Sequence, residues 1–144
     1  MPSFPSPKAS ALPGAALALV LTLAGPGSAA ADEAEIAPGY NACMAASFTD
    51  DEKYACIDEA YEYWDFRLNK NYRALMSVLS KRPDKKKALQ KAERSWIVFK
   101  ENMAAVVADL SGRTMDERML SRLYLAAATR DQANLLAFLR DSID

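Results

Sequence analysis

Histidine is absent from the 144-residue sequence, and this absence excludes the commonest kinds of active site. Histidine is the usual general base near neutral pH, and it activates the serine or cysteine nucleophile of many hydrolases. Its imidazole is also the commonest protein ligand for metal ions. Enzymes that use carboxylates remain possible, but we predict no bound metal or cofactor.

Cysteine is nearly absent, since the chain contains only Cys43 and Cys56. A redox-active thiol pair usually has CxxC spacing, and a zinc site would need two more ligands, which a chain without histidine does not readily supply. Outside the cytoplasm, such a pair normally oxidises. We predict a Cys43–Cys56 disulfide, which closes a short loop and contributes ~3 kcal/mol to stability.

Long apolar runs are missing after residue 31, but a short one lies near the N-terminus. Lys8 precedes the apolar stretch 11–24, helix-breaking residues follow at 25–27, and small residues occupy 28–31. This order is typical of a signal peptide. The stretch is shorter than the ~20 residues of a membrane-spanning helix, and no cysteine follows the cleavage site directly. We predict a soluble periplasmic or secreted protein with no membrane span or lipid anchor.

The sequence divides into a signal peptide (1–31), a flexible mature N-terminus (32–38) and a single helical domain (39–144). The 113 residues that remain after cleavage suffice for one domain with a modest core. Cleavage removes one base and no acid, which leaves 17 bases and 19 acids. This balance gives no electrostatic reason to bind nucleic acid. We therefore expect a protein partner.

Glycine and proline are rare: between Glu52 and Arg140 the chain has one of each, Pro83 and Gly112. Both fall at predicted helix boundaries, Pro83 in a first turn and Gly112 at a C-terminal end. No stretch alternates apolar and polar residues as a strand would. Because short loops make consecutive helices antiparallel neighbours, the sequence predicts an all-α fold. The predicted fold is a compact antiparallel bundle of three long helices plus a short N-terminal helix near Gly39, linked by the one disulfide.

Apolar residues recur at steps of three and four along each long helix and are predicted to face the core. Capping boxes at Thr49 to Glu52 and Thr114 to Glu117 mark the starts of the second and fourth helices, and the second runs to about Ser80. The predicted inner residues are Ile57, Tyr61, Trp64, Leu68, Tyr72, Leu75 and Leu79 on the second helix, Leu89, Ala92, Trp96, Phe99, Met103, Val107 and Leu110 on the third, and Leu120, Leu123, Tyr124, Ala127, Leu135 and Phe138 on the fourth. Both tryptophans are thus expected in the core and not in a ligand platform.

Carboxylates are the remaining catalytic candidates, and Glu59, Glu62 and Asp65 share one side of the second helix. A glycosidase needs two such groups across a cleft, whereas charges on a single helix usually face water. Asp65 lies closest to the apolar stripe, so we expect it to be partly buried and to need a partner. We predict a structural contact between Asp65 and Lys100 of the third helix.

Two segments form a specific combination. The first is WDxxLNxxYxxL, formed by Trp64, Asp65, Leu68, Asn69, Tyr72 and Leu75, and the second runs from Ala92 to Glu101 and includes Trp96 and Lys100, with Thr129 and Arg130 following later. Together with Cys43, Cys56 and Glu59, they resemble the LprI-type lysozyme-inhibitor N-terminal domain family over residues 40–139. The resemblance implies a small helical exported bacterial protein. It also implies lysozyme inhibition, the activity of the member that gave the family its name.

The sequence departs from the family pattern in ways that bear on a partner. Members commonly have two further cysteines, and Ala104 and Tyr124 take their places here. Glu93 stands for the usual glutamine, Lys100-Glu101 for the usual Arg-Asp pair, and Gln132 for a frequent arginine. Because the second cysteine pair is missing, no disulfide can join the third and fourth helices, and we expect them to hold together by packing alone.

We interpret the protein as an exported, non-catalytic binding protein, most concretely an inhibitor of a lysozyme-like muramidase. Lysozyme-type catalysis depends on two carboxylates in a groove, which basic groups on a rigid scaffold would block. Lys81, Arg82 and Arg113, in loops at helix boundaries, are the candidate partner-binding residues, although most loop cations are simply solvated surface. The alternative is a structural adaptor or immunity-like partner in the cell envelope, which an exposed apolar patch would favour. The sequence does not define the oligomeric state.

Overall fold

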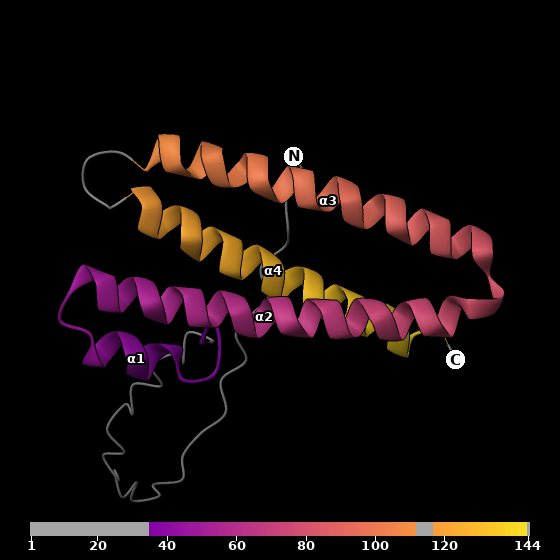
Figure 1. Cartoon of the computed structure of the whole chain (residues 1–144), viewed down its shortest axis with the longest axis horizontal. Helices are drawn as coiled ribbons and strands as arrows, with labels where there is room; N and C mark the ends of the chain where they lie inside the picture. The colour runs from indigo at the N-terminus through magenta and orange to yellow at the C-terminus, as the bar shows by residue number, and fades with distance from the viewer. Residues whose placement is uncertain (1–34, 112–116, 144) are drawn as a thin grey trace, which may run out of the picture. The chain divides into compact units, whose positions relative to one another are not determined.

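Helices make up nearly all of the computed structural model, which describes residues 35–111 and 117–143 (Figure 1). The elements are α1 (Tyr40–Ala46), α2 (Asp50–Val78), the 3-10 turn η1 (Leu79–Lys81), α3 (Pro83–Leu110) and α4 (Glu117–Asp141). No strand occurs in these two ranges. The predicted all-α class, with three long helices and a short N-terminal one, is confirmed. The predicted signal peptide and the loop at 112–116, with Gly112, Arg113 and Thr114, lie outside the described residues.

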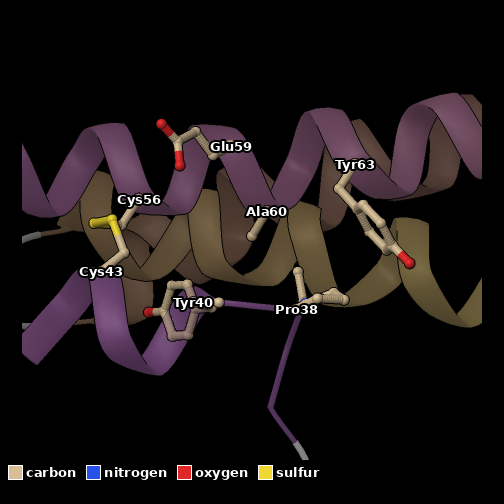
Figure 2. A pocket seen from close by; sticks show the side chains of 9 residues that line it. Pro38, Tyr40, Cys43, Cys56, Glu59, Ala60 and Tyr63 are labelled. Atoms are coloured by element: carbon tan, nitrogen blue, oxygen red, sulfur yellow. A yellow bond between two sulfur atoms is a disulfide. The ribbon is translucent and has the colours of Figure 1, made fainter.

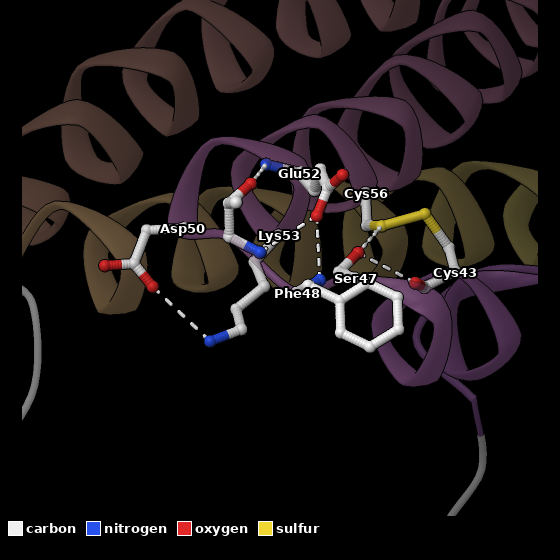
Figure 3. A network of polar contacts seen from close by, with 8 residues as sticks. Cys43, Ser47, Phe48, Asp50, Glu52, Lys53 and Cys56 are labelled. Carbon is white, nitrogen blue, oxygen red and sulfur yellow. Dashed lines mark hydrogen bonds and ion pairs between the residues drawn. A yellow bond between two sulfur atoms is a disulfide. The ribbon is translucent and has the colours of Figure 1, made fainter.

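The predicted capping box sets the start of α2 (Figure 3). The Thr49 side chain accepts a hydrogen bond from the backbone N–H of Glu52 at 3.2 Å, and the Glu52 carboxylate accepts from the N–H groups of Thr49 and Phe48 at 2.9 and 2.7 Å. These bonds to the charged carboxylate, foremost that from the Thr49 backbone, lower the pKa of Glu52. Pro83 likewise lies in the first turn of α3, as predicted.

The helix α4 packs along α2 and also against α3. Figure 1 shows α2 and α3 joined through η1 at one end and diverging from there, with α4 crossing between them. Ala126 and Ala133 of α4 are fully buried, and such small side chains allow the α2 backbone to come close. The Asn71 side chain of α2 consequently donates a hydrogen bond to the Ala133 carbonyl oxygen at 2.8 Å.

A leucine cluster near η1 forms the main apolar core. Its buried members are Leu75, Leu79 and Leu136, and Leu68, Tyr72, Leu89, Leu139 and Ile143 pack around them. At the opposite end of α2, the buried residues are Cys56, Ile57 and Ala60. The predicted α2 stripe is confirmed, because three of its members are buried and the other four are half-buried.

The predicted stripes of α3 and α4 are wrong in part. On α3, Ala92, Phe99 and Leu110 are exposed, and the buried residues are Glu93, Lys100 and Ala104. On α4, Leu135 and Phe138 are exposed, and Ala126, Thr129, Ala133 and Leu136 are buried. The helix α4 turns mainly small side chains toward its neighbours, because the size of the side chains at a contact limits how closely helices approach. Apolar periodicity alone does not include this constraint.

Candidate functional site

Residues from both motif segments line one groove between α2 and α3, which we call the α2–α3 groove. It has a volume of about 240 Å³ and is lined by Leu68, Asn69 and Tyr72 from α2 and by Gln90, Glu93, Arg94 and Ile97 from α3. Ile97 is 42% exposed, so a partner can reach the apolar wall of the groove. The two halves of the sequence pattern therefore meet at one surface.

Glu93 is buried on the inner side of this groove beside a neutral partner. Its Oε1 accepts a hydrogen bond from Gln132 Nε2 of α4 at 2.6 Å. Burial raises the pKa of Glu93, and the bond from Gln132 offsets only part of that effect. Both positions depart from the family pattern in the sequence, and the structure brings them into contact. The two departures thus form one interhelical pair.

Lys100 is buried two turns further along α3, and aromatic rings surround its ammonium group. Its Nζ lies 4.8 Å from the Trp96 ring centroid, 5.4 Å from the Tyr61 ring centroid and 3.5 Å from the Tyr61 hydroxyl. Cation–π attraction is strongest at such desolvated sites. Lys100 therefore contacts both Trp96 of its own helix and Tyr61 of α2.

The predicted contact between Asp65 and Lys100 is wrong. Asp65 is half-buried, as expected, but its carboxylate accepts a hydrogen bond from Asn69 Nδ2 at 3.0 Å, one turn along the same helix. Asn69 also donates to the Asp65 carbonyl oxygen at 2.9 Å. The Asn69 amide thus serves as the hydrogen-bond partner of this carboxylate. Lys100 instead lies against the rings of Tyr61 and Trp96, because α3 is rotated about its axis relative to the prediction.

Trp64 links α2 to the segment before α1. Its indole N–H donates a hydrogen bond to the Ile36 carbonyl oxygen at 2.5 Å. Tyr63 meets the indole edge-on at a centroid distance of 5.0 Å, and the Arg67 guanidinium lies 5.7 Å from the indole centroid. Trp64 is half-buried. Its indole therefore holds the N-terminal segment and supports Arg67.

The predicted disulfide is confirmed and joins α1 to α2 (Figure 2). The Cα atoms of Cys43 and Cys56 are 5.8 Å apart. A pocket of about 130 Å³ lies beside it, and its lining residues come from the segment 37–63. Glu59 is the one carboxylate among these lining residues. This pocket lacks the pair of facing acids that glycoside hydrolysis needs. In the described ranges, no group of acidic or cysteine side chains is arranged to hold a metal ion.

A basic pocket that sequence reasoning missed lies between α2 and α4. It has a volume of about 240 Å³ and is lined by Arg67, Lys70, Asn71, Ala137 and Arg140. Arg140 pairs with Asp141 at 2.7 Å and donates to Asn71 Oδ1 at 3.3 Å. Arg67 and Lys70 are exposed and take part in no ion pair among the described residues. The pocket therefore presents positive charge suited to a carboxylate.

Two of the three predicted loop cations lie among the described residues. Lys81 ends η1 and Arg82 directly precedes α3, and both are exposed. The third, Arg113, lies outside the described residues. The structure therefore describes the surroundings of Lys81 and Arg82 alone among the three.

A family model described as lysozyme inhibitor LprI matches residues 43–136. The matched range begins at the disulfide, contains both segments of the α2–α3 groove and ends at Leu136 of the leucine cluster. No curated protein and no solved structure matches the chain. Within the described part of the chain, no helix combines the length and the apolar character needed to cross a membrane.

Proposed function

The chain belongs to the LprI family of lysozyme inhibitors, and we propose that it is an exported, non-catalytic protein that binds a lysozyme-like muramidase and blocks its active site. The family match over residues 43–136 carries this proposal. The Cys43–Cys56 disulfide supports export, because such bonds persist in oxidising compartments. The signal peptide expected at residues 1–31 would direct the chain to the periplasm or the medium.

The charge distribution indicates which end of the bundle would meet the enzyme. Between Arg67 and Arg94 the chain has ten lysines and arginines and two acids, whereas the segment 50–66 has seven acids and one lysine. Of the two acids in the basic segment, Glu93 is buried and Asp84 lies 3.8 Å from Lys85. We call this end, from Arg67 through η1 to Arg94, the basic end.

A muramidase groove contains two carboxylates, so a cationic projection on a rigid support complements it. Lys81 and Arg82 fit that description. The Arg82 backbone N–H donates a hydrogen bond to the Leu79 carbonyl oxygen at 2.9 Å, and Leu79 is buried in the leucine cluster. We assign these two side chains to the carboxylates of the enzyme and the nearby basic pocket to acidic groups at the rim of its groove.

The test is inhibition of a purified lysozyme on cell walls, with charge-reversal variants of both ends. Lys81→Glu and Arg82→Glu should weaken inhibition at least tenfold, because losing a charge paired at a buried interface costs ~2 to 5 kcal/mol of binding. Both variants should change stability by no more than ~0.5 kcal/mol. Lys53→Glu is the matched control, since Lys53 is the one lysine of the acidic segment 50–66. Its Nζ lies 3.3 Å from the Asp50 carboxylate. Equal losses in all three variants would contradict the assignment to the basic end.

The alternative function is that of a structural adaptor or immunity-like partner of another envelope protein. The exposed apolar side chains Val98, Phe99 and Leu110 on α3 favour it, with 57%, 59% and 79% exposure. Pull-down from a periplasmic extract separates the two functions. A partner other than a muramidase, with lysozyme activity unaffected at micromolar protein, would favour the alternative.

A further inference from the structure

One face of α3, part of which packs against its own bundle, has the pattern of a two-helix interface. Its apolar residues alternate in steps of three and four over three heptads, and we call this row the α3 seam: Leu89, Ala92, Trp96, Phe99, Met103, Val106 and Leu110. Leu89, Trp96 and Met103 are half-buried against the bundle, whereas Ala92, Phe99, Val106 and Leu110 are exposed. Such spacing is that of helices that pack side by side along their length.

Charges along α3 favour an antiparallel partner of the same sequence. The exposed Lys91 in its first half and the exposed Asp109 in its second half lie on the same edge of the seam, both about 80° around the helix from Phe99. A parallel pair would leave these opposite charges about 27 Å apart along the helix axis. An antiparallel pair brings Lys91 of each helix beside Asp109 of the other, as complementary charges around a coiled-coil seam do.

We propose that two copies of this chain associate through their α3 seams, antiparallel, with the two-fold axis at Phe99. In this register Ala92 of each copy lies opposite Val106 of the other, and Ala88 lies opposite Leu110. Small side chains therefore face large ones, which allows the two surfaces to interdigitate. Lys91 of each copy comes within about one helical turn of Asp109 of the other copy. The interface is isologous and closes on itself as a dimer.

The dimer leaves the basic ends free. Arg82 is 17 residues from Phe99 along the chain, so the two copies of this residue lie on opposite sides of the axis, about 50 Å apart. Each copy can then present Lys81 and Arg82 to a separate partner. The dimer does not depend on the proposed inhibition, and the two can be tested separately.

The first test is the molar mass of the exported protein, measured by light scattering during size-exclusion chromatography at micromolar concentration. The expected mass is that of a dimer, and Phe99→Glu should shift it to a monomer. Val98→Glu is the matched control, because Val98 has nearly the same exposure as Phe99, 57% against 59%, but points about 100° away around the helix. A monomeric wild type, or equal effects of both variants, would overturn the proposal.

The second test measures the direction of the helices and does not depend on how Phe99→Glu folds. Under mild oxidation, Phe99→Cys should cross-link to its own copy, because the two-fold axis brings the two thiols together. Leu110→Cys should not, because it lies opposite Ala88. Cross-linking of Leu110→Cys to itself would indicate a parallel pair and contradict the proposed register.

Discussion

At the disulfide end of the bundle, α1 buries none of its own residues and is held by the Cys43–Cys56 bond. The hydrogen bond from Trp64 to Ile36 holds the segment before it. At the η1 end, by contrast, buried leucines from α2, η1 and α4 pack directly against one another. At the first end, a covalent link and a polar contact hold α1 and the segment before it, whereas apolar burial holds the elements of the second end together. A surface of stable, basic helices is therefore available at the η1 end, where we place the enzyme contact.

The largest loss of stability is expected from a substitution in the leucine cluster at the η1 end. Leu75 is 2% exposed, and Leu75→Ala should reduce the free energy of unfolding by ~2 to 5 kcal/mol, as large-to-small core substitutions do. Leu135→Ala is the control, because Leu135 is 46% exposed, and it should cost less than about 1 kcal/mol. Denaturant unfolding measures both. Equal losses would mean that this cluster is not the main core.

Removing the disulfide should affect the opposite end more locally. The double variant Cys43→Ser with Cys56→Ser should lose up to ~3 kcal/mol, the chain-entropy contribution of so short a loop. Because α1 buries no residue of its own, amide hydrogen exchange should accelerate in 40–46 while the cores of α2 and α4 remain protected. Equal acceleration in all helices would show that the two ends unfold as one unit.

Two glutamates should respond to pH in opposite ways. The pKa of Glu52 is lowered, so its contribution to stability is present at neutral pH and is lost as the pH falls through the folded-state pKa. The pKa of Glu93 is raised by burial, so its contribution is present in acid and is lost as the pH rises through the folded-state pKa.

At neutral pH, Glu52→Gln should therefore destabilise the protein. Glu93→Gln should stabilise it by on the order of 1 kcal/mol, because the hydrogen bond from Gln132 can persist without a buried charge. Both differences should shrink toward low pH. Melting temperatures of the wild type and the two variants between about pH 3 and about pH 8 test this. A destabilised Glu93→Gln at neutral pH would show that the charge has a partner in solution.

Local signals in the sequence predict much of the fold. The capping box at Thr49, the proline at the start of α3 and the disulfide each depend on residues close together in the chain, and all three are confirmed. The α2 stripe is also correct, because its apolar residues meet those of α4 and η1 in the core.

Features that depend on how the helices are turned were not predictable in the same way. The phase of α3 is set by contacts such as Ala104, which is buried and whose carbonyl oxygen accepts a hydrogen bond from Ser121 Oγ at 2.9 Å. This rotation exposes Phe99 and directs Lys100 toward Tyr61. The basic pocket was missed because Arg140 reaches Arg67 and Lys70 only when α4 packs on α2.

Competition for the muramidase groove is the most direct test of the proposed inhibition. Binding of the wild-type protein to a purified lysozyme is measured by calorimetry, first alone and then with a saturating soluble oligosaccharide of N-acetylglucosamine in the groove. If Lys81 and Arg82 occupy the groove, the protein should bind at micromolar concentration or tighter, and the oligosaccharide should weaken binding at least tenfold. Absence of binding, or an affinity that the oligosaccharide leaves unchanged, would contradict active-site inhibition of that enzyme.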